Sequence, residues 1–391
     1  MLSVIHRARK SLGRPFLVLC AVVLSACVPA GGPTTGPATG TGGNVQVALL
    51  IPSGSGQAQD ELFGQSLENA ARLAMADLRG VTIDLRVYRT GGSPAQASAL
   101  ARQAVDEGAQ VILGPFYSEE ANAAGVAVAN SGVNVLAFSN NAAIAGGNVF
   151  VLGQTFDNTA RRLASYAVRN GKSKVLIVHD RNVAGEVGKA AIERGVSRAG
   201  GSVVGISSYE FSQNGIVQAA SGIVGTARSS GATALFLTAD TAGALPLLSQ
   251  LLVDNGIDRA STQFIGLTRW DIPPATLALP GVQGGWFAMP DPGLQAQFQS
   301  RYQGAYGSGP SAVAGLAYDG IAAIGALARG SNGAPITRDA LTQSAGFAGV
   351  SGIFRLLPNG TNERGLAVAQ IRNNQVVIID AAPRSFAGAG F

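Results

Sequence analysis

Residues 45–54 read Val-Gln-Val-Ala-Leu-Leu-Ile-Pro-Ser-Gly, an apolar run that ends at a turn-forming triplet. A short, nearly continuous apolar run bounded by Pro and Gly is typical of a strand buried on both faces of a parallel sheet. Leu67, Ala71, Ala74 and Leu78 then recur at spacings of three or four residues, which predicts a helix with one buried face. Together the two segments predict the first strand–helix unit of an α/β fold.

The alternation of short apolar runs and helical patterns continues to residue 379. Strands are expected at 45–51, 81–87, 111–113, 133–138, 175–178, 203–207, 235–237, 264–267, 282–287, 349–356, 366–371 and 375–379. Further helices are expected near 94–107, 119–130, 158–170, 185–199, 215–230, 242–254, 293–305 and 311–328. These are more strands than one open sheet usually holds, so the sequence predicts an α/β fold of two doubly wound parallel-sheet lobes.

The N-terminal segment has the layout of a secretory signal. Residues 1–26 carry four basic and no acidic side chains, and their apolar run is too short to span a bilayer as a helix. The tetrad Leu24-Ser25-Ala26-Cys27 resembles the bacterial lipobox, which implies a signal peptide over 1–26 and lipidation of Cys27. An uncleaved anchor with an incidental cysteine is the alternative.

Residues 28–43 contain no charged side chain and are rich in Gly, Pro, Thr and Ala, so 27–43 is expected to be a lipidated flexible linker. Val28, not Asp, follows Cys27, and by resemblance to enterobacterial sorting rules this favours the outer membrane. The expected location is therefore the periplasm, with a lipid anchor in the membrane.

Composition excludes several functions. The chain has a formal net charge of +5, but removal of the four basic residues in 1–26 leaves the remainder nearly neutral, so no nucleic-acid partner is expected. Cys20 lies in the signal and Cys27 carries the lipid, which leaves no thiol for a disulfide or a metal site. His179 is the only histidine outside the signal, and no metal or cofactor is expected.

No enzyme motif is present. The chain lacks a Gly-x-Ser-x-Gly elbow at a strand–helix junction, a Walker phosphate loop and a His-Glu-x-x-His zinc motif. The adjacent pair His179-Asp180 would have to supply a catalytic triad, but neighbours on a strand point in different directions. A binding protein is therefore expected, not an enzyme.

Ligands of open parallel sheets bind beyond the carboxyl ends of the strands, and this rule selects the candidate residues. Each has a structural alternative: Ser118 as an N-cap, the amide and serine side chains as turn formers, the aromatics as packing between lobes, and the aspartates as helix caps. The candidate ligand-binding residues are Tyr117, Ser118, Ser139, Asn140, Asn141, Asp240, Trp270 and Asp271.

Several of these stretches, taken in order, resemble the type 1 periplasmic binding proteins, especially the leucine/isoleucine/valine-binding family. The matching segments are 47–54, a long helix from Gly64 to Ala76-Asp77, 114–118, 133–139, 177–180, Ala317-Tyr318-Asp319, 352–355 and 358–360, so the resemblance covers nearly all of 44–380. It implies a hinge of three crossings between lobe one, about 44–155 and 281–348, and lobe two, about 156–280 and 349–391. It also implies that Ser118 and the residues from Asn140 to Ala143 hold an amino-acid ligand, with Asp240, Trp270 and Asp271 contributing from the other lobe.

This chain departs from the amino-acid binders at two positions. Ala143 stands near a usual threonine and Ala184 near a usual tyrosine, so the resemblance does not specify leucine, isoleucine or valine as the ligand.

A second resemblance points to another role. Residues 265–271 and 284–291 are similar to penicillin-binding-protein activators, outer-membrane lipoproteins of the same fold that stimulate peptidoglycan synthesis. The sequence thus supports two functions: a lipid-anchored binding protein for a small polar ligand that serves an ABC permease, or an activator of a penicillin-binding protein.

Overall fold

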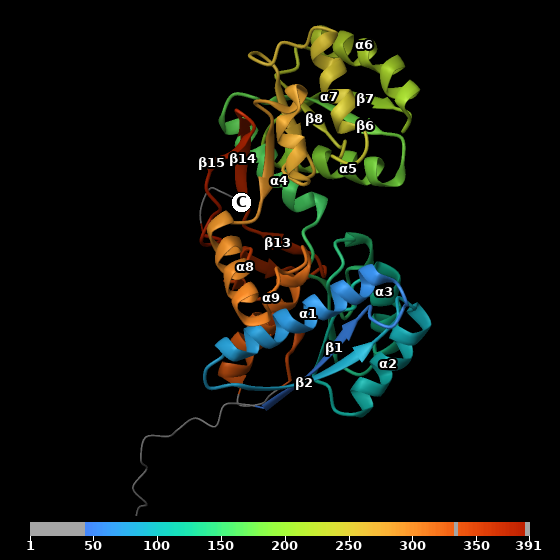
Figure 1. The fold of residues 1–391 in the computed structure, drawn as a ribbon, viewed down its shortest axis with the longest axis vertical. Coiled ribbons are helices and arrows are strands. Elements are labelled where there is room, and N and C mark those ends of the chain that lie inside the picture. Colours follow the sequence, from blue (N-terminus) through green and yellow to red (C-terminus); the bar gives the residue numbers. More distant parts are fainter. Residues whose placement is uncertain (1–43, 332–334, 388–391) are drawn as a thin grey trace, which may run out of the picture. The chain divides into compact units, whose positions relative to one another are not determined.

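We describe residues 44–331 and 335–387 of a computed structural model; the predicted signal peptide, Cys27 and the linker lie outside the described residues. Two separate parallel sheets organise this part of the chain, and the helices cover their faces (Figure 1). No helix within the described ranges is long and apolar enough to cross a membrane.

Lobe one contains a five-stranded parallel sheet of order β2-β1-β3-β4-β5. Apart from the short 3-10 helix η1, its N-terminal half alternates strands and helices as the sequence predicts. Its elements are β1 (Asn44–Ile51), α1 (Ala58–Asp77), β2 (Thr82–Arg89), α2 (Pro94–Asp106), β3 (Val111–Leu113), α3 (Ser118–Ala127), β4 (Asn134–Ala137), η1 (Ala142–Ile144) and β5 (Val149–Val151).

Lobe two repeats the strand order in a larger sheet, β15-β14-β10-β9-β8-β6-β7, in which β6 to β10 are parallel and β14 and β15 form an antiparallel edge. Its elements are α4 (Phe156–Arg169), β6 (Lys174–Asp180), α5 (Val183–Arg198), β7 (Ser202–Tyr209), α6 (Gln213–Ser230), β8 (Ala234–Leu237), α7 (Leu245–Asp254), β9 (Gln263–Gly266), η2 (Pro274–Ala278), η3 (Pro280–Val282), β10 (Trp286–Met289), β14 (Ala367–Arg372) and β15 (Gln375–Asp380).

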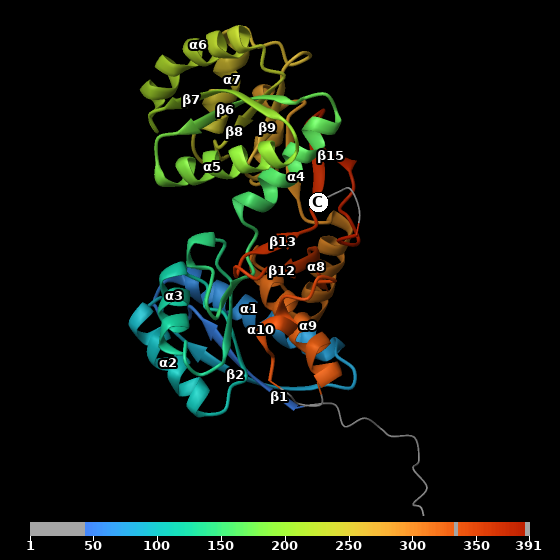
Figure 2. The ribbon, with the colours of Figure 1, turned by 180° about the vertical axis from the view of Figure 1, so that it is seen from behind.

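The chain returns to lobe one after β10. There it forms α8 (Pro292–Tyr306), α9 (Ala314–Ser331), α10 (Arg338–Leu341) and a small antiparallel sheet of β11 (Phe347–Gly349), β12 (Gly352–Leu356) and β13 (Asn362–Arg364), seen from behind in Figure 2. Three crossings therefore join the sheets: between β5 and α4, between β10 and α8, and between β13 and β14.

The sheets divide the chain differently from the expected lobe ranges in two places. β10 was expected in lobe one but hydrogen-bonds to β9 and β14 of lobe two. β12 was expected in lobe two, yet its Phe354 and Leu356 are buried in the core of lobe one. The two boundaries therefore lie near 290 and 365.

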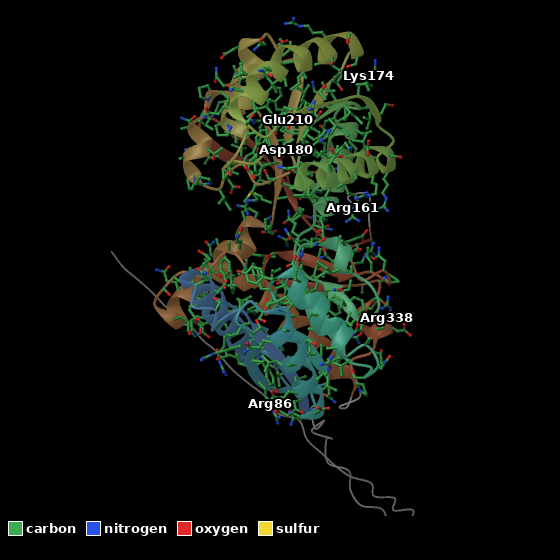
Figure 3. All side chains as sticks on the ribbon, turned by 90° about the vertical axis from the view of Figure 1, so that its right-hand side faces the viewer. Arg86, Arg161, Lys174, Asp180, Glu210 and Arg338 are labelled. Atoms are coloured by element: carbon green, nitrogen blue, oxygen red, sulfur yellow. The ribbon has the colours of Figure 1, made fainter. Side chains whose placement is uncertain are left out.

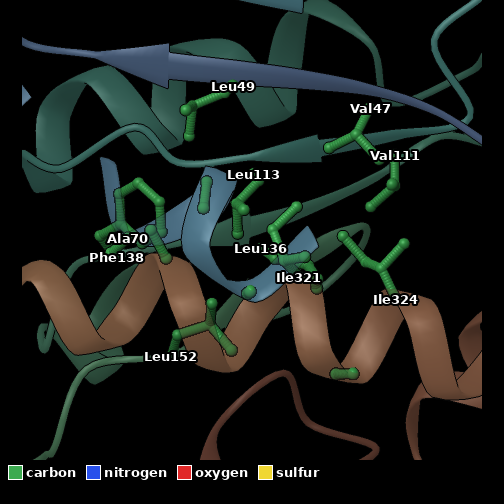
Figure 4. Packing of buried hydrophobic residues seen from close by; sticks show 14 of the residues in the cluster. Val47, Leu49, Ala70, Val111, Leu113, Leu136, Phe138, Leu152, Ile321 and Ile324 are labelled. Carbon is green, nitrogen blue, oxygen red and sulfur yellow. The ribbon is translucent and has the colours of Figure 1, made fainter. Parts of the chain in front are cut away.

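The core of lobe one shows why apolar runs form these strands. Side chains from one face of the sheet, including Val47, Leu49, Leu113 and Leu136, are fully buried against α1 and α9 (Figure 4). The opposite face packs on α2 and α3. Each strand is therefore apolar on both sides. Burial of each Leu or Ile side chain contributes about 1.5–3 kcal/mol of hydrophobic free energy to folding.

Candidate functional site

A cavity of about 450 Å³ lies beyond the carboxyl ends of β3 and β4, where lobe one meets all three crossings. We call it the hinge cavity. Most polar groups on its wall come from the loops after β3 and β4, with Gln154, Ser351 and Arg364 in addition, and apolar groups come from these loops, from the start of α9 and from the last crossing. Its lining residues are Phe116, Tyr117, Ser118, Glu119, Phe138, Ser139, Asn140, Asn141, Gly153, Gln154, Pro290, Ala312, Val313, Gly315, Leu316, Ser351, Arg364 and Leu366.

The loop after β3 reaches the cavity through a backbone shape that only glycine tolerates. Gly114 has φ +93°, and a Cβ there would lie 2.2 Å from the carbonyl oxygen of Leu50. Tyr117 then takes the N-cap position of α3, and Ser118 is the first helical residue, so the N-cap alternative for Ser118 is wrong. The Ser118 hydroxyl donates to Glu119 Oε2 (3.0 Å). A ligand carboxylate would have to take the hydroxyl hydrogen of Ser118 in place of Glu119, whereas the unpaired amides of the first helical turn are free donors in this donor wall.

The loop after β4 supplies the second group of donors. The buried Ser139 accepts a hydrogen bond from the backbone N–H of Asn141 (3.1 Å), and Asn141 Oδ1 accepts from the N–H of Ala143 (2.9 Å). Both side chains therefore also shape the turn, as their structural alternative predicts. The exposed Asn140 side chain makes no hydrogen bond within the described part of the chain, which leaves its amide available to a ligand.

Tyr117 is held in place by a residue that the sequence did not single out. Its hydroxyl donates to Asp60 on α1, which also accepts from Ser55 Oγ (2.6 Å). The hydrogen bond to Asp60, followed by burial, raises the pKa of Tyr117 to about 12, so the phenol stays neutral at physiological pH. The ring packs edge-on against Phe116, with centroids 5.0 Å apart.

Glu120 lies behind the donor wall in the first turn of α3. It is fully buried, and no well-formed hydrogen bond reaches either carboxylate oxygen within the described residues, although the Thr90 side chain and the Tyr117 backbone lie nearby. Burial raises the pKa of Glu120; Thr90 and the Tyr117 backbone oppose this in part, and the negative charges of Asp60 and Glu119 add to the rise.

Glu120→Gln is expected to stabilise the protein at neutral pH. Because the pKa of Glu120 is raised on folding, its contribution to stability is fully present below the ordinary pKa of glutamate and is lost as pH rises through the raised value. The substitution removes a buried unpaired charge, a gain of about 1–3 kcal/mol. Melting temperatures from acid to neutral pH should fall less steeply for Glu120→Gln than for the wild type. Glu119→Gln, on the exposed side of the same turn, is the control; an equal response of both variants would contradict the prediction.

A buried ion pair borders the cavity. The Arg364 guanidinium donates to Asp319 Oδ2 (2.9 Å) and, from two nitrogens, to the carbonyl oxygen of Leu152 (2.9 and 2.5 Å). Asp319 Oδ1 accepts from the N–H of Val350 (2.8 Å). The pair thus ties the first and third crossings to α9.

The candidates from lobe two do not line the hinge cavity. Asp240 is exposed and accepts from the N–H of Gly243 (2.6 Å), as a turn former does. Asp271 pairs with Arg269 two residues earlier (Nε–Oδ1 2.7 Å). Trp270 is fully buried in the core of lobe two, so it packs within that lobe and lines no cleft.

His179 has the environment of a structural histidine. It is buried at the end of β6, and its Nδ1 lies 3.2 Å from the carbonyl oxygen of Asp180 and 3.5 Å from Glu186 Oε1. Asp180 accepts from Oγ1 of Thr238, which directly follows the neighbouring β8 (2.6 Å), so it does not orient the imidazole. The described residues contain no group of three or more His, Cys, Asp or Glu side chains that could hold a metal ion.

Comparison with known proteins identifies the family. A family model described as periplasmic binding protein matches residues 44–375, and the chain belongs to this family. Its members bind substrates and are not enzymes, which confirms the expectation of a binding protein, and the family implies a periplasmic location.

Solved structures share the fold at low sequence identity. A putative branched-chain amino acid ABC transporter protein from Rhodospirillum rubrum has 21% identity and TM-score 0.71, and the match covers 86% of this chain and 99% of that one. A substrate-binding protein from Desulfitobacterium hafniense in complex with Leu has 17% identity and TM-score 0.62, covering 86% and 100%. A solute-binding protein from Rhodopseudomonas palustris in complex with 3,4-dihydroxybenzoic acid has 17% identity and TM-score 0.57, covering 87% and 98%. A search of curated proteins found no match.

Proposed function

We propose that the protein binds a small carboxylate-bearing solute, in the first place an amino acid, in the hinge cavity and delivers it to an ABC-type importer. The observation that carries this proposal is the convergence of Ser118, Ser139 and Asn140 on one cavity of about 450 Å³ at the carboxyl ends of neighbouring strands. Two solved structures of the same fold hold Leu and 3,4-dihydroxybenzoic acid, and both molecules are carboxylic acids.

The charges on the cavity wall favour an amino acid over a simple acid. The hydroxyl, amide and helix N-terminal donors suit a carboxylate. Glu119 lies on the same wall and its carboxylate suits an ammonium group, whereas it would repel a ligand that carries only negative charge. Phe116, Val313 and Leu366 line the remainder, which suits an apolar side chain.

A set of related probes tests the ligand class by thermal shift. Leucine, leucinamide and 4-methylpentanoate differ only in the carboxylate and the amine, and 3,4-dihydroxybenzoate adds an aromatic acid. A ligand that binds only the native state raises the melting temperature. The proposal predicts stabilisation by leucine or another amino acid and a smaller effect of the two truncated probes. The absence of any shift across amino acids, amides, aromatic acids and muropeptides would reject it.

Ser118→Ala is expected to weaken binding of the active probe about tenfold, the value of one hydrogen bond to a charged group. Ser229→Ala is the matched control because Ser229 is an exposed serine on α6, where its hydroxyl donates to Thr226. Isothermal titration of both variants measures the effect. Equal affinities for Ser118→Ala and the control would show that the Ser118 hydroxyl does not bind the ligand.

Membrane anchoring through a lipid on Cys27, with the outer membrane as the expected location, belongs to the same proposal. It is supported by the Leu-Ser-Ala-Cys tetrad and by Val28. Fractionation of Cys27→Ser against the wild type tests it, since the variant should appear in the soluble periplasmic fraction.

Activation of a penicillin-binding protein is the second candidate function. It is supported by the similarity of residues 265–271 and 284–291 to activator lipoproteins. This function would be rejected if the protein does not co-purify with a penicillin-binding protein and if adding it leaves glycan synthesis unchanged.

A further inference from the structure

A small pocket of about 50 Å³ adjoins the hinge cavity, and we call it the side pocket. It lies between α8, the segment that leads into α9 and the turn that joins β11 to β12. Figure 3 draws the side chains of α8 and α9, whose ribbons are orange. Ala312, Gly315 and Ser351 line both the side pocket and the hinge cavity, so the two spaces meet at these residues.

The residues at this junction are small. Gly315 has no side chain, and a Cβ at its position would lie 3.1 Å from Val350 Cγ2 and 3.6 Å from Ser351 Oγ. A side chain on residue 315 would therefore fill the space between the start of α9 and the β11–β12 turn. Ala312 and Ser351 have short side chains, so no bulky group separates the side pocket from the hinge cavity at the residues that they share.

The side pocket is polar and uncharged. Its described lining includes Gln295 and Gln299 of α8 and Ser351, and none of its lining residues is Asp, Glu, Lys, Arg or His. Gln295 and Gln299 are four positions apart, which places them on one face of α8. The side chains of Gln295, Gln299 and Ser351 make no hydrogen bond within residues 44–331 and 335–387, so their donors and acceptors are available to a ligand.

This lining selects a neutral polar group. Carboxamides and hydroxyls both donate and accept hydrogen bonds, so they pair best with a ligand group that does both. A ligand carboxylate or ammonium in the side pocket would lose its water without gaining an opposite charge, which costs free energy. The volume of the side pocket gives room for about four water-sized groups, which is enough for a carboxamide.

We propose that the solute is an amino acid whose side chain ends in a carboxamide, and that the side pocket binds this carboxamide. The inference rests on the proposed function, because it takes the ligand's backbone carboxylate and ammonium groups to lie in the hinge cavity, at the amides of α3 and at Glu119. The methylene groups of the ligand side chain then cross the hinge cavity beside Val313 and Leu316, which flank Gly315 at the start of α9.

Calorimetric titration of the full processed protein with glutamine, glutamate and methionine tests the proposal, since the side chains of these probes have similar lengths. We expect glutamine to bind at least about tenfold more tightly than the other two. Methionine leaves the polar groups of the side pocket without a partner, and glutamate brings a charge that no cation meets there.

Gln295→Leu should remove most of this selectivity. We expect its affinity for glutamine to fall about tenfold, with little change for methionine, so the ratio of the two affinities falls as well. Gln303→Leu is the matched control and should keep the wild-type ratio, because Gln303 is an exposed residue further along α8 that does not line the side pocket. A general loosening of the fold would lower both affinities together, so the ratio reports on the side pocket.

Two results would overturn the inference: glutamine bound no more tightly than methionine or glutamate, or an unchanged affinity ratio in Gln295→Leu. Either result leaves the proposed function standing if the wild type binds any amino acid. If the wild type binds no amino acid at all, the proposed function is rejected and the inference fails with it.

Discussion

Replacement of Asp319 by alanine is expected to cost about 3–5 kcal/mol of the free energy of unfolding, because it leaves the Arg364 guanidinium buried without its carboxylate. Asp319 is fully buried and Arg364 is 5% exposed, so water cannot take over the lost contact. Urea denaturation followed by circular dichroism measures the change. We also expect weaker solute binding, because Arg364 lines the hinge cavity and holds Leu152 of the first crossing.

The matched control is an exposed pair of the same residue types. Arg301 contacts both oxygens of Asp77 at 2.6 Å, with side chains that are 40% and 38% exposed. Asp77→Ala should cost about 0–1 kcal/mol because solvent screens this pair. An Asp319→Leu, Arg364→Met double variant should recover much of the loss, since no charge remains buried. Similar losses for Asp319→Ala and Asp77→Ala would contradict this account.

The sequence predicted the repeating part of the fold because hydrophobic periodicity reports directly on burial. The expected strand at 45–51 and the helix at 94–107 agree with β1 and α2 to within one residue. Three strands escaped this signal. β5, β11 and β13 contain three residues each; β11 reads Phe-Ala-Gly and β13 reads Asn-Glu-Arg, so neither forms an apolar run, whereas β5 reads Val-Phe-Val and was missed although β3 of the same length was predicted. Asn362 and Arg364 of β13 are buried through hydrogen bonds to backbone carbonyls, which no hydropathy pattern shows.

The candidate site was predictable only in part. The rule that ligands lie beyond the carboxyl ends of parallel strands selected Tyr117, Ser118 and Ser139, and the structure brings these to one cavity. The same rule selected Asp240 and Asp271, which are held by local hydrogen bonds within lobe two. A strand-end position specifies an edge of a sheet, but it does not say whether a short polar side chain faces a ligand or its own loop.

Glu119 and Arg364 show a different limit of the sequence. Glu119 follows two candidate residues, Tyr117 and Ser118, but an acidic residue in the first turn of a helix is common because it interacts favourably with the helix dipole, so its residue type was no reason to single it out. Arg364 pairs with a residue that is 45 positions away, and its other contacts are backbone oxygens. Partners so far apart in the sequence can be identified only from the folded structure, in which the three crossings lie side by side.

Trp270→Ala is expected to destabilise lobe two by about 3–5 kcal/mol, the cost of emptying a fully buried aromatic site. The indole packs directly on two glycines: a Cβ on Gly266 would lie 2.2 Å from Trp270 Nε1, and one on Gly285 would lie 2.2 Å from Cζ3. This packing accounts for the spacing of Gly266, Trp270 and Gly285 in the stretches that resemble the activators. Phe211→Ala, at a lobe-two side chain that is 56% exposed, should change stability by less than about 0.5 kcal/mol.

A double-mutant cycle separates packing from ligand contact at Trp270. Gly266→Ala alone should be strongly destabilising, but in the Trp270→Ala background the added methyl group enters the space that the indole has left, so the two costs should not add. Additive losses would show that the ring and the glycine do not share this space. Solute affinity, measured well below the melting temperature, should be unchanged in Trp270→Ala, because the ring does not line the hinge cavity. If Trp270→Ala instead keeps the wild-type melting temperature but binds the solute more weakly, Trp270 contacts the ligand. A loss of affinity without a loss of stability would indicate a direct contact.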